Sequence, residues 1–358
     1  MIYLDYASTS PLKQKVLEGL HKCLNEEFAN PSSAHKLGKG LAKKLEQLEK
    51  DFLKDFDPEA ELIFTSGATE SNNMIIKGLD FEDNEHILYN RADHPSIVNV
   101  VESQKTPRVA FDEKNLLEKI NGKSRLLLLT HIHNLSGVIT PYLDQVKEIK
   151  KKYPRLHVHI DGAQAFGKYS ISDIGADSYC FSGHKFGGPK GIGGLFLNSD
   201  VDLKPLIEGG GQQKELRSGT INYPFIHALS LAYKQREDAQ KVMGLKEMIK
   251  SELKEYFQFP FEHMNTSAFI LLAQIEKVSS DILLRFLESK NIYISSSSAC
   301  SSKIKGFNPT YSAMGIEEKY HKNILRISLS SQTNQEEIKQ FCIEVKEVFK
   351  EIKHLLRK

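Results

Sequence analysis

The sequence predicts an α/β fold: a large, doubly wound domain with a mostly parallel sheet, followed by a smaller α+β domain. Over the first two-thirds of the chain, short apolar segments alternate with segments of helical periodicity, which is typical of strands separated by helices. The 358 residues are 40% hydrophobic, so they can bury one large core or two unequal ones. Around Pro224 the alternation ends, which indicates the second domain.

In the first part of the chain, strands are expected at the short apolar runs and helices at the amphipathic segments between them. The expected strands are residues 62–64, 86–89, 125–130, 157–160, 178–181 and 194–197. The expected helices are residues 38–56, 70–78, 95–103 and 143–152. Such sheets bind ligands beyond the carboxyl ends of their strands, so functional residues are expected there.

In the second part, a long helical stretch is expected from residue 225 to about residue 256, with later strands at 268–272, 292–294 and 324–329. Residues 339–358 have helical periodicity and a solvated face rich in lysine and glutamate. The buried stripe of this helix is expected to consist of Phe341, Val345, Phe349, Ile352 and Leu355. We expect a large domain at residues 12–239 and a small domain at residues 1–11 and 240–358.

Composition and charge argue against several functions. A formal net charge of +2 argues against a nucleic-acid partner, and no apolar run is long enough to cross a membrane. Asp5 interrupts the apolar start that a signal peptide would need. The four cysteines form no C-x-x-C pair, so a reducing cytoplasm is expected. The H-x-H pairs at residues 131–133 and 157–159 lie on strand-like runs with no cysteine spaced to complete a zinc site, so no metal is expected.

Lys185 lies in a glycine-rich segment, SGHKFGGPKG at residues 182–191, downstream of Asp161. A lysine amine can form a Schiff base with the aldehyde of pyridoxal phosphate, and a carboxylate at a strand end can keep the pyridine nitrogen protonated. The glycines leave room for close backbone approach. Alternatively, Lys185 is a surface lysine and Asp161 caps the next helix. The two residues together favour a pyridoxal-phosphate site.

Other segments supply groups that such a cofactor would need. TSGATESN at residues 65–72 follows a strand and opens a helix, where free N–H groups and the helix dipole can bind a phosphate, although an ordinary N-cap uses the same residue types. His94 precedes a helix start and can stack on a pyridine ring. Gln164 is placed to donate a hydrogen bond to a ring oxygen. Ser182 and His184 can add hydrogen bonds to the phosphate.

Cys300 lies in a serine-rich run, SSSSACSS at residues 295–302. Such a run is typical of a mobile loop, which a thiol needs to reach a substrate sulfur, although a chance exposed cysteine in a polar linker is the alternative. Arg326 places a guanidinium in an apolar strand, where its partner is either a substrate carboxylate or a structural salt bridge. The remaining cysteines are expected to pack in the core: Cys23, Cys180 and Cys342.

Together these residues resemble the cysteine desulfurases of the class V aminotransferase family, which are fold type I pyridoxal-phosphate enzymes. The resemblance runs over nearly the whole chain. Besides the cysteine loop and the Arg326 strand, it rests on YLDYA at residues 3–7, NPSSAH at 30–35, SGATES at 66–71, SGHK at 182–185 and RSGT at 217–220.

The resemblance implies a role for each matching residue. Lys185 would bind the cofactor covalently and shuttle protons, and Cys300 would attack the sulfur of L-cysteine to form a persulfide and release alanine. A protein acceptor, either an iron–sulfur scaffold or a tRNA-thiolation carrier, would take this sulfur. The resemblance also implies that Asp161 pairs with the pyridinium nitrogen, that Gln164 pairs with the phenolate oxygen and that His94 stacks on the ring. Asn134 would contact the cofactor and, together with Arg326, bind the substrate carboxylate. The phosphate would be bound by Ala68, Thr69, Ser182, His184 and, from the second subunit of a homodimer, Thr220.

The sequence also departs from the family pattern, which suggests a divergent paralogue with a particular acceptor. The departures include His133, Leu135, Ser297 and Ser330. The alternatives are a selenocysteine lyase with the same fold and cofactor, or a scaffold that has lost its chemistry. Retention of both Lys185 and Cys300 argues against the scaffold, and a true aminotransferase would have no use for Cys300.

Overall fold

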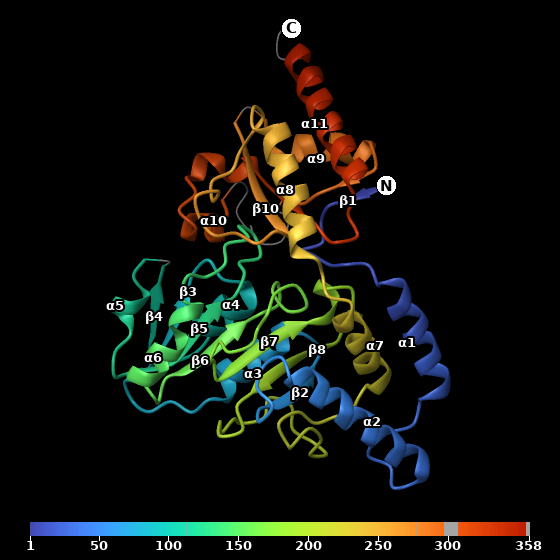
Figure 1. Cartoon of the computed structure of the whole chain (residues 1–358). Helices are drawn as coiled ribbons and strands as arrows, with labels where there is room; N and C mark the ends of the chain where they lie inside the picture. The colour runs from blue at the N-terminus through green and yellow to red at the C-terminus, as the bar shows by residue number, and fades with distance from the viewer. Residues whose placement is uncertain (113, 277, 297–306, 356–358) are drawn as a thin grey trace. The chain divides into compact units, whose positions relative to one another are not determined.

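The computed structural model describes residues 1–112, 114–276, 278–296 and 307–355, and the chain forms two compact units (Figure 1). The large unit contains Ser10–His131 and Thr140–Arg236. The small unit contains Met1–Thr9, Ile132–Ile139 and Glu237–Lys358. The short segment Ile132–Ile139 thus belongs to the small unit although it interrupts the sequence of the large one. None of the helices in the described ranges is both long and apolar enough to span a membrane.

The large unit is built on one sheet whose strands share a direction, except that β8 runs opposite to both of its neighbours. In order across the sheet, the strands are β2 (Glu61–Thr65), β8 (Gly193–Leu197), β7 (Ser178–Ser182), β6 (His157–Asp161), β5 (Ser124–Thr130), β3 (His86–Asn90) and β4 (Arg108–Phe111). Every strand expected in this part of the chain is present. The edge strand β4 was not expected, because it is short, begins with an exposed arginine and is only half-buried over most of its length.

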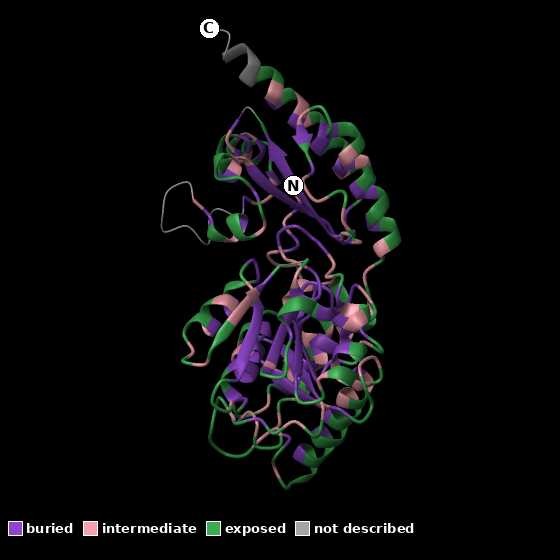
Figure 2. Cartoon of the chain, turned by 90° about the vertical axis from the view of Figure 1, so that its left-hand side faces the viewer, coloured by how far each residue is buried: buried purple, intermediate pink, exposed green. Residues whose placement is uncertain are grey.

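The side chains of the central strands alternate between two apolar cores, one on each face of the sheet. In β5, Leu127 and Leu129 belong to the core that includes α1 (Gln14–Glu26), α2 (Lys36–Leu53), α6 (Val146–Lys152) and α7 (Tyr223–Lys234). Leu126 and Leu128 belong to the core that includes α3 (Ala68–Gly78) and α4 (Pro95–Glu102). Figure 2 shows these strands as buried. Burial on both faces confirms the predicted doubly wound α/β architecture. The large unit also contains the short helix α5 (Leu116–Lys119).

The prediction of one long helix from residue 225 to about residue 256 is wrong. The chain forms α7 and then α8 (Ala239–Leu253), with a non-helical connection between them. Gln235 leaves the helical conformation, with φ −99° and ψ 58°. Asp238 then caps α8, because its side chain accepts a hydrogen bond from the Lys241 N–H at 3.0 Å. A favoured N-cap residue therefore starts a new helix within a continuous helical periodicity.

The small unit combines short strands and helices in the part of the chain that the structure describes. β1 (Ile2–Tyr3) pairs in parallel with β11 (Ile292–Tyr293), and β10 (Ile270–Ile275) pairs antiparallel with both β9 (Phe257–Gln258) and β12 (Ile324–Ser328). Of the predicted stripe on the last helix, Phe341 and Val345 are buried and Phe349 is half-buried. The helices are α8, α9 (Ser280–Ser289), α10 (Pro309–Ala313) and α11 (Gln335–Leu355).

Candidate active site

Asp161 ends β6, at the carboxyl edge of the parallel strands, and is only 5% exposed. Its Oδ1 accepts a hydrogen bond from the Ala163 N–H at 2.9 Å, and its Oδ2 accepts one from Asn72 Nδ2 at 2.8 Å. These two donors hold the carboxylate in one orientation at the strand end. Asn72 was not among the predicted site residues. Its place on α3, one helical turn after Ala68, puts it close to the predicted phosphate-binding turn, but its partner Asp161 lies far away in sequence.

His94 is the N-cap residue of α4, where its Nδ1 accepts a hydrogen bond from the Ser96 N–H at 3.1 Å and lies 2.8 Å from Ser96 Oγ. Protein atoms surround much of the His94 imidazole, although the residue as a whole is exposed to solvent. This crowding lowers the pKa of His94; the negative charge of Asp161 opposes the effect and the positive charge of Lys185 adds to it. Asp161 and Lys185 are thus close enough to His94 to affect the pKa of its imidazole. A neutral imidazole at this position can stack on a ring.

The N-terminus of α3 is the predicted phosphate-binding turn. Gly67 precedes the helix with φ 149°, and a Cβ there would lie 3.0 Å from Ser182 Oγ. Ser182 Oγ instead accepts a hydrogen bond from the Ala68 N–H at 2.8 Å. The next N–H groups have no partner within the helix, because the first turn of any helix lacks one. The RSGT motif reaches the same turn, since Arg217 Nε donates to Glu70 Oε1 at 2.9 Å.

Lys185 ends a short 3₁₀ turn, Gly183–Lys185, that follows β7. The Phe186 N–H closes this turn by donating to Gly183 O at 3.2 Å, and a Cβ on Gly183 would lie only 2.8 Å from Leu229 Cδ1. Lys185 and His184 are half-buried. Burial, followed by the positive charge of Lys185, lowers the pKa of His184 to about 4, so this imidazole is neutral at neutral pH.

Gln164 and Thr220 differ in their surroundings. Gln164 is buried, and its Oε1 lies 3.4 Å from Lys168 Nζ as a hydrogen-bond acceptor. Thr220 is exposed and follows Gly219, which has a φ of 116°. The same loop holds residues 213–215, which are not glycines but all have positive φ, between 49° and 65°. Such left-handed backbone is strained and is typical of functional segments. The ring contact of Gln164 and the phosphate contact of Thr220 stay predictions.

In the small unit, Arg326 is buried on β12 and held by polar groups of the unit itself. Its Nη2 donates to Asp5 Oδ1 at 2.9 Å and to Ser8 Oγ at 2.6 Å, and its Nη1 donates to the backbone oxygen of Asn134 at 3.0 Å. Of the two partners expected for Arg326, the structural salt bridge is therefore present, and binding of a substrate carboxylate stays a prediction. Leu135, one of the departures from the family pattern, is buried in an apolar cluster.

The predicted nucleophile Cys300 lies outside the described residues, as does Ser297. The other cysteines are buried, which confirms the expectation for Cys23, Cys180 and Cys342. Burial raises the pKa of Cys23 and of Cys342 to about 12. A protonated buried thiol is a poor nucleophile, so core packing is the role of these cysteines.

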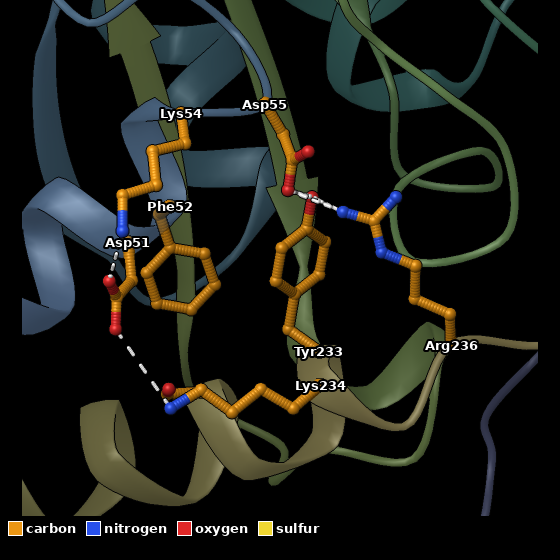
Figure 3. A pocket seen from close by; sticks show the side chains of 8 residues that line it. Asp51, Phe52, Lys54, Asp55, Tyr233, Lys234 and Arg236 are labelled. Atoms are coloured by element: carbon orange, nitrogen blue, oxygen red, sulfur yellow. Dashed lines mark hydrogen bonds and ion pairs between the residues drawn. The ribbon is translucent and has the colours of Figure 1, made fainter.

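A separate cavity of about 290 Å³ lies on the large unit beside the ends of α2 and α7 (Figure 3). Its charged side chains pair with one another: Asp55 accepts a hydrogen bond from the Tyr233 hydroxyl at 2.6 Å and forms an ion pair with Arg236, and Asp51 pairs with Lys54 at 2.9 Å. None of the predicted site residues is among the residues that line it. It is therefore not part of the candidate active site.

Comparison with known proteins identifies the family of this chain. Residues 2–341 match the family described as aminotransferase class-V. A "NifS/IcsS protein homolog" from Lactobacillus delbrueckii subsp. bulgaricus is 32% identical over 99% of this chain and 100% of its own length. A cysteine desulfurase IscS from Rickettsia bellii is 32% identical over 94% of this chain and 88% of its own length. A solved structure titled "SspA in complex with cysteine" has a TM-score of 0.81 and 29% identity, covering 93% of this chain and 100% of that chain.

These matches confirm the fold type I architecture and the enzyme class that the sequence predicts. Members of this family use pyridoxal phosphate as their cofactor. Their similarity extends over nearly the whole of this chain, so it includes both units. The chain belongs to the aminotransferase class-V family and is one of its pyridoxal-phosphate-dependent cysteine desulfurases.

Proposed function

We propose that this chain converts L-cysteine to L-alanine and holds the removed sulfur as a persulfide on Cys300. The observation that carries this proposal is the double role of α3 in the large unit. The N-terminal N–H groups of the helix can bind a phosphate, and its Asn72 orients the carboxylate of Asp161, which can pair with a ring nitrogen. One helix would therefore support both ends of a pyridoxal-phosphate site.

The residues of the large unit fit this cofactor. Pyridoxal phosphate, when bound, supplies an electron sink that weakens the bonds at the α-carbon of the substrate. Its phosphate would bind in the turn that Gly67 keeps open, because any larger residue would place a Cβ against Ser182 Oγ. The phosphate ligands would be Ala68, Thr69, Ser182 and His184, with Thr220 from the second subunit of a homodimer.

Four side chains would hold the ring and move protons. Lys185 Nζ would bind the cofactor covalently and then carry protons to and from the substrate carbon atoms. The carboxylate of Asp161 would keep a proton on the ring nitrogen. Gln164 would donate a hydrogen bond to the ring oxygen, and the neutral imidazole of His94 would stack on the ring face and exchange protons with the substrate.

In the sulfur-transfer step, the thiolate of Cys300 would attack the substrate sulfur. An S–S bond forms while the C–S bond breaks; the carbon keeps the electron pair and takes up a proton to become the methyl group of alanine. The transferred sulfur is oxidised as the carbon is reduced, so no external oxidant is required. Asn134, which also contacts the cofactor in this proposal, and Arg326 would bind the substrate carboxylate, with Arg326 exchanging Asp5 for it.

The persulfide would pass to a protein acceptor. Its sulfur would serve iron–sulfur cluster assembly or tRNA thiolation. We place the enzyme in a reducing cytoplasm because the Cys300 thiol, once its persulfide sulfur has been passed on, must be free and reduced for the next turnover.

A matched pair of lysine variants tests this proposal. We expect Lys185→Ala to lose the yellow absorbance of the bound cofactor and to release no alanine from L-cysteine. Lys190→Ala should keep both, because Lys190 is an exposed lysine of the same glycine-rich segment. The measurement is the absorbance spectrum of the purified protein together with chromatographic detection of alanine. Alanine release by Lys185→Ala at the wild-type rate would contradict the proposal.

A further inference from the structure

Asn72 is completely buried on α3, and its amide nitrogen donates two hydrogen bonds. One goes to Asp161 Oδ2 at 2.8 Å and the other to Ser96 Oγ at 2.9 Å. A carboxylate can only accept hydrogen bonds, so the contact with Asp161 fixes which end of the amide is the NH₂ group. The Asn72 oxygen must then point the other way, as an acceptor.

That oxygen receives donors from two strands. His159 Nε2 lies 2.9 Å from Asn72 Oδ1, and Cys180 Sγ lies 3.2 Å from it. Burial raises the pKa of the Cys180 thiol and lowers that of the His159 imidazole, so the thiol stays protonated and the imidazole stays neutral. A neutral imidazole carries one proton, and the Asn72 oxygen places it on Nε2.

The direction of the remaining hydrogen bonds follows. His159 Nδ1 must accept, and its partner is Ser178 Oγ at 2.8 Å. Because the Ser178 hydroxyl proton points at His159, Ser178 Oγ must in turn accept from His157 Nε2, which lies 2.7 Å away. The donors thus run in one direction, from His157 through Ser178 and His159 to Asn72, and end on the carboxylate of Asp161.

A second branch leads from Asn72 to His94. Asn72 Nδ2 donates to Ser96 Oγ, so the Ser96 hydroxyl proton is directed away from Asn72 and toward His94 Nδ1 at 2.8 Å. The Ser96 N–H also donates to this nitrogen. His94 therefore carries its proton on Nε2.

We propose that Asn72 is a positioning residue that joins a one-way chain of buried donors to Asp161 and, through Ser96, to His94. It keeps Asp161 a pure acceptor and orients both groups that would contact the cofactor ring. The link to the cofactor rests on the proposed function, whereas the direction of the chain does not.

Two substitutions at this position separate the two ends of the amide. Asn72→Leu removes the acceptor of His159 Nε2–H, and leaving a buried N–H unpaired is costly enough to shift a tautomer equilibrium by about tenfold to hundredfold. We expect the proton of His159 to move to Nδ1, where Ser178 Oγ can accept it. Asn72→Asp keeps an acceptor for His159 but places a second carboxylate against Asp161. His159 should therefore keep its Nε2–H tautomer in that variant.

The tautomers are measured by ¹⁵N NMR of cofactor-free protein labelled at histidine, with signals assigned through His159→Gln and His94→Gln. Cofactor retention is measured separately by equilibrium dialysis against pyridoxal phosphate, and both Asn72 variants should bind it about tenfold to hundredfold more weakly. Asn73→Ala is the matched control, because Asn73 is the next residue of α3 and donates only to the backbone oxygen of Thr69 in the described structure. It should change neither readout.

An unchanged His159 tautomer in folded Asn72→Leu would overturn the proposed chain. Wild-type cofactor affinity in both Asn72→Leu and Asn72→Asp would overturn the positioning role. If Asn72→Leu does not fold, Asn72→Asp decides the second point, because it has nearly the same shape as asparagine. Neither measurement uses L-cysteine, so failure of the desulfurase reaction would leave this result intact.

Discussion

Asp93 is a buried carboxyl in the loop before α4, next to His94. Its Oδ1 accepts a hydrogen bond from Thr130 Oγ1 at 2.7 Å, and its Oδ2 has no partner among the residues that the structure describes. Burial, with a smaller contribution from the charge of Asp161, raises the pKa of Asp93 from 3.8 to about 7. Between these two values the folded protein binds a proton that the unfolded chain does not. The stability that this proton contributes is lost as the pH rises through about 7.

We therefore expect Asp93→Asn to become progressively more stable than the wild type as the pH rises from about 4 to about 7. The difference in unfolding free energy should grow by roughly 1.4 kcal/mol per pH unit, because asparagine resembles the neutral acid and never ionises. Urea unfolding followed by circular dichroism measures this difference, since the chain has no tryptophan. Asp200→Asn changes an exposed aspartate and should follow the wild-type profile. Parallel profiles for Asp93→Asn and the wild type would show that Asp93 is not a buried acid.

At individual positions, the sequence predicted the role of a side chain well where that side chain ends a regular local pattern. It predicted the role less well where that role depends on contacts with distant parts of the chain. Asp161 was identifiable because it ends a short apolar run before a glycine. Asn72 was not, because its role depends on partners that lie on other elements and far away in sequence. The partner of Arg326 stayed open for the same reason. Asp5 is separated from it by nearly the whole chain, and no local pattern indicates that contact.

Among the elements, β8 determines how closely the turn proposed to bind the phosphate can approach the sheet. Gly193 begins this strand and pairs with Thr65 on one side and Ser182 on the other. A Cβ on Gly193 would lie 2.3 Å from Phe181 O and 2.6 Å from Gly67 Cα. Both are backbone atoms, so the clash cannot be relieved by rotating a side chain.

We expect Gly193→Ala to push the turn at Gly67 away from the sheet, to weaken cofactor binding and to destabilise the protein by about 1–3 kcal/mol. Gly40→Ala is the matched control, because a Cβ there would meet nothing within 4 Å and alanine favours the helix by up to about 1 kcal/mol. Thermal unfolding and dialysis against pyridoxal phosphate measure the two effects. Normal cofactor affinity in Gly193→Ala would mean that this close approach does not support the phosphate site.

The prediction of strands was accurate where a strand is buried on both faces of the sheet, because such a strand has an uninterrupted apolar run in the sequence. β5 and β6 are such strands, and their expected bounds agree with the structure to within one residue. The edge strand β4 carries a weaker apolar signal, because one of its sides has no strand neighbour. The break between α7 and α8 was missed because the capping aspartate, Asp238, does not interrupt the helical periodicity around it.

At the scale of the whole molecule, the chain assigns different tasks to its two units. Except for Asn134, the residues proposed to bind the cofactor, such as Lys185 and Asp161, belong to the large unit. Arg326 and Asn134, proposed to bind the substrate carboxylate, belong to the small unit. The sequence predicted these residues through separate short motifs, because each motif has its own local pattern. Tests of the complete reaction therefore require the full chain.

The most direct test of the central claim measures alanine and protein persulfide together after L-cysteine is added to the wild type and to Cys300→Ser, both loaded with pyridoxal phosphate. Mass spectrometry assigns the added sulfur to a peptide, and the peptides with Cys23, Cys180 and Cys342 are internal controls. We predict that the wild type releases alanine and carries the extra sulfur on the Cys300 peptide alone, whereas Cys300→Ser binds the cofactor but forms no persulfide. A persulfide on another cysteine, or undiminished sulfur release from L-cysteine by Cys300→Ser, would contradict the assignment of Cys300 as the nucleophile.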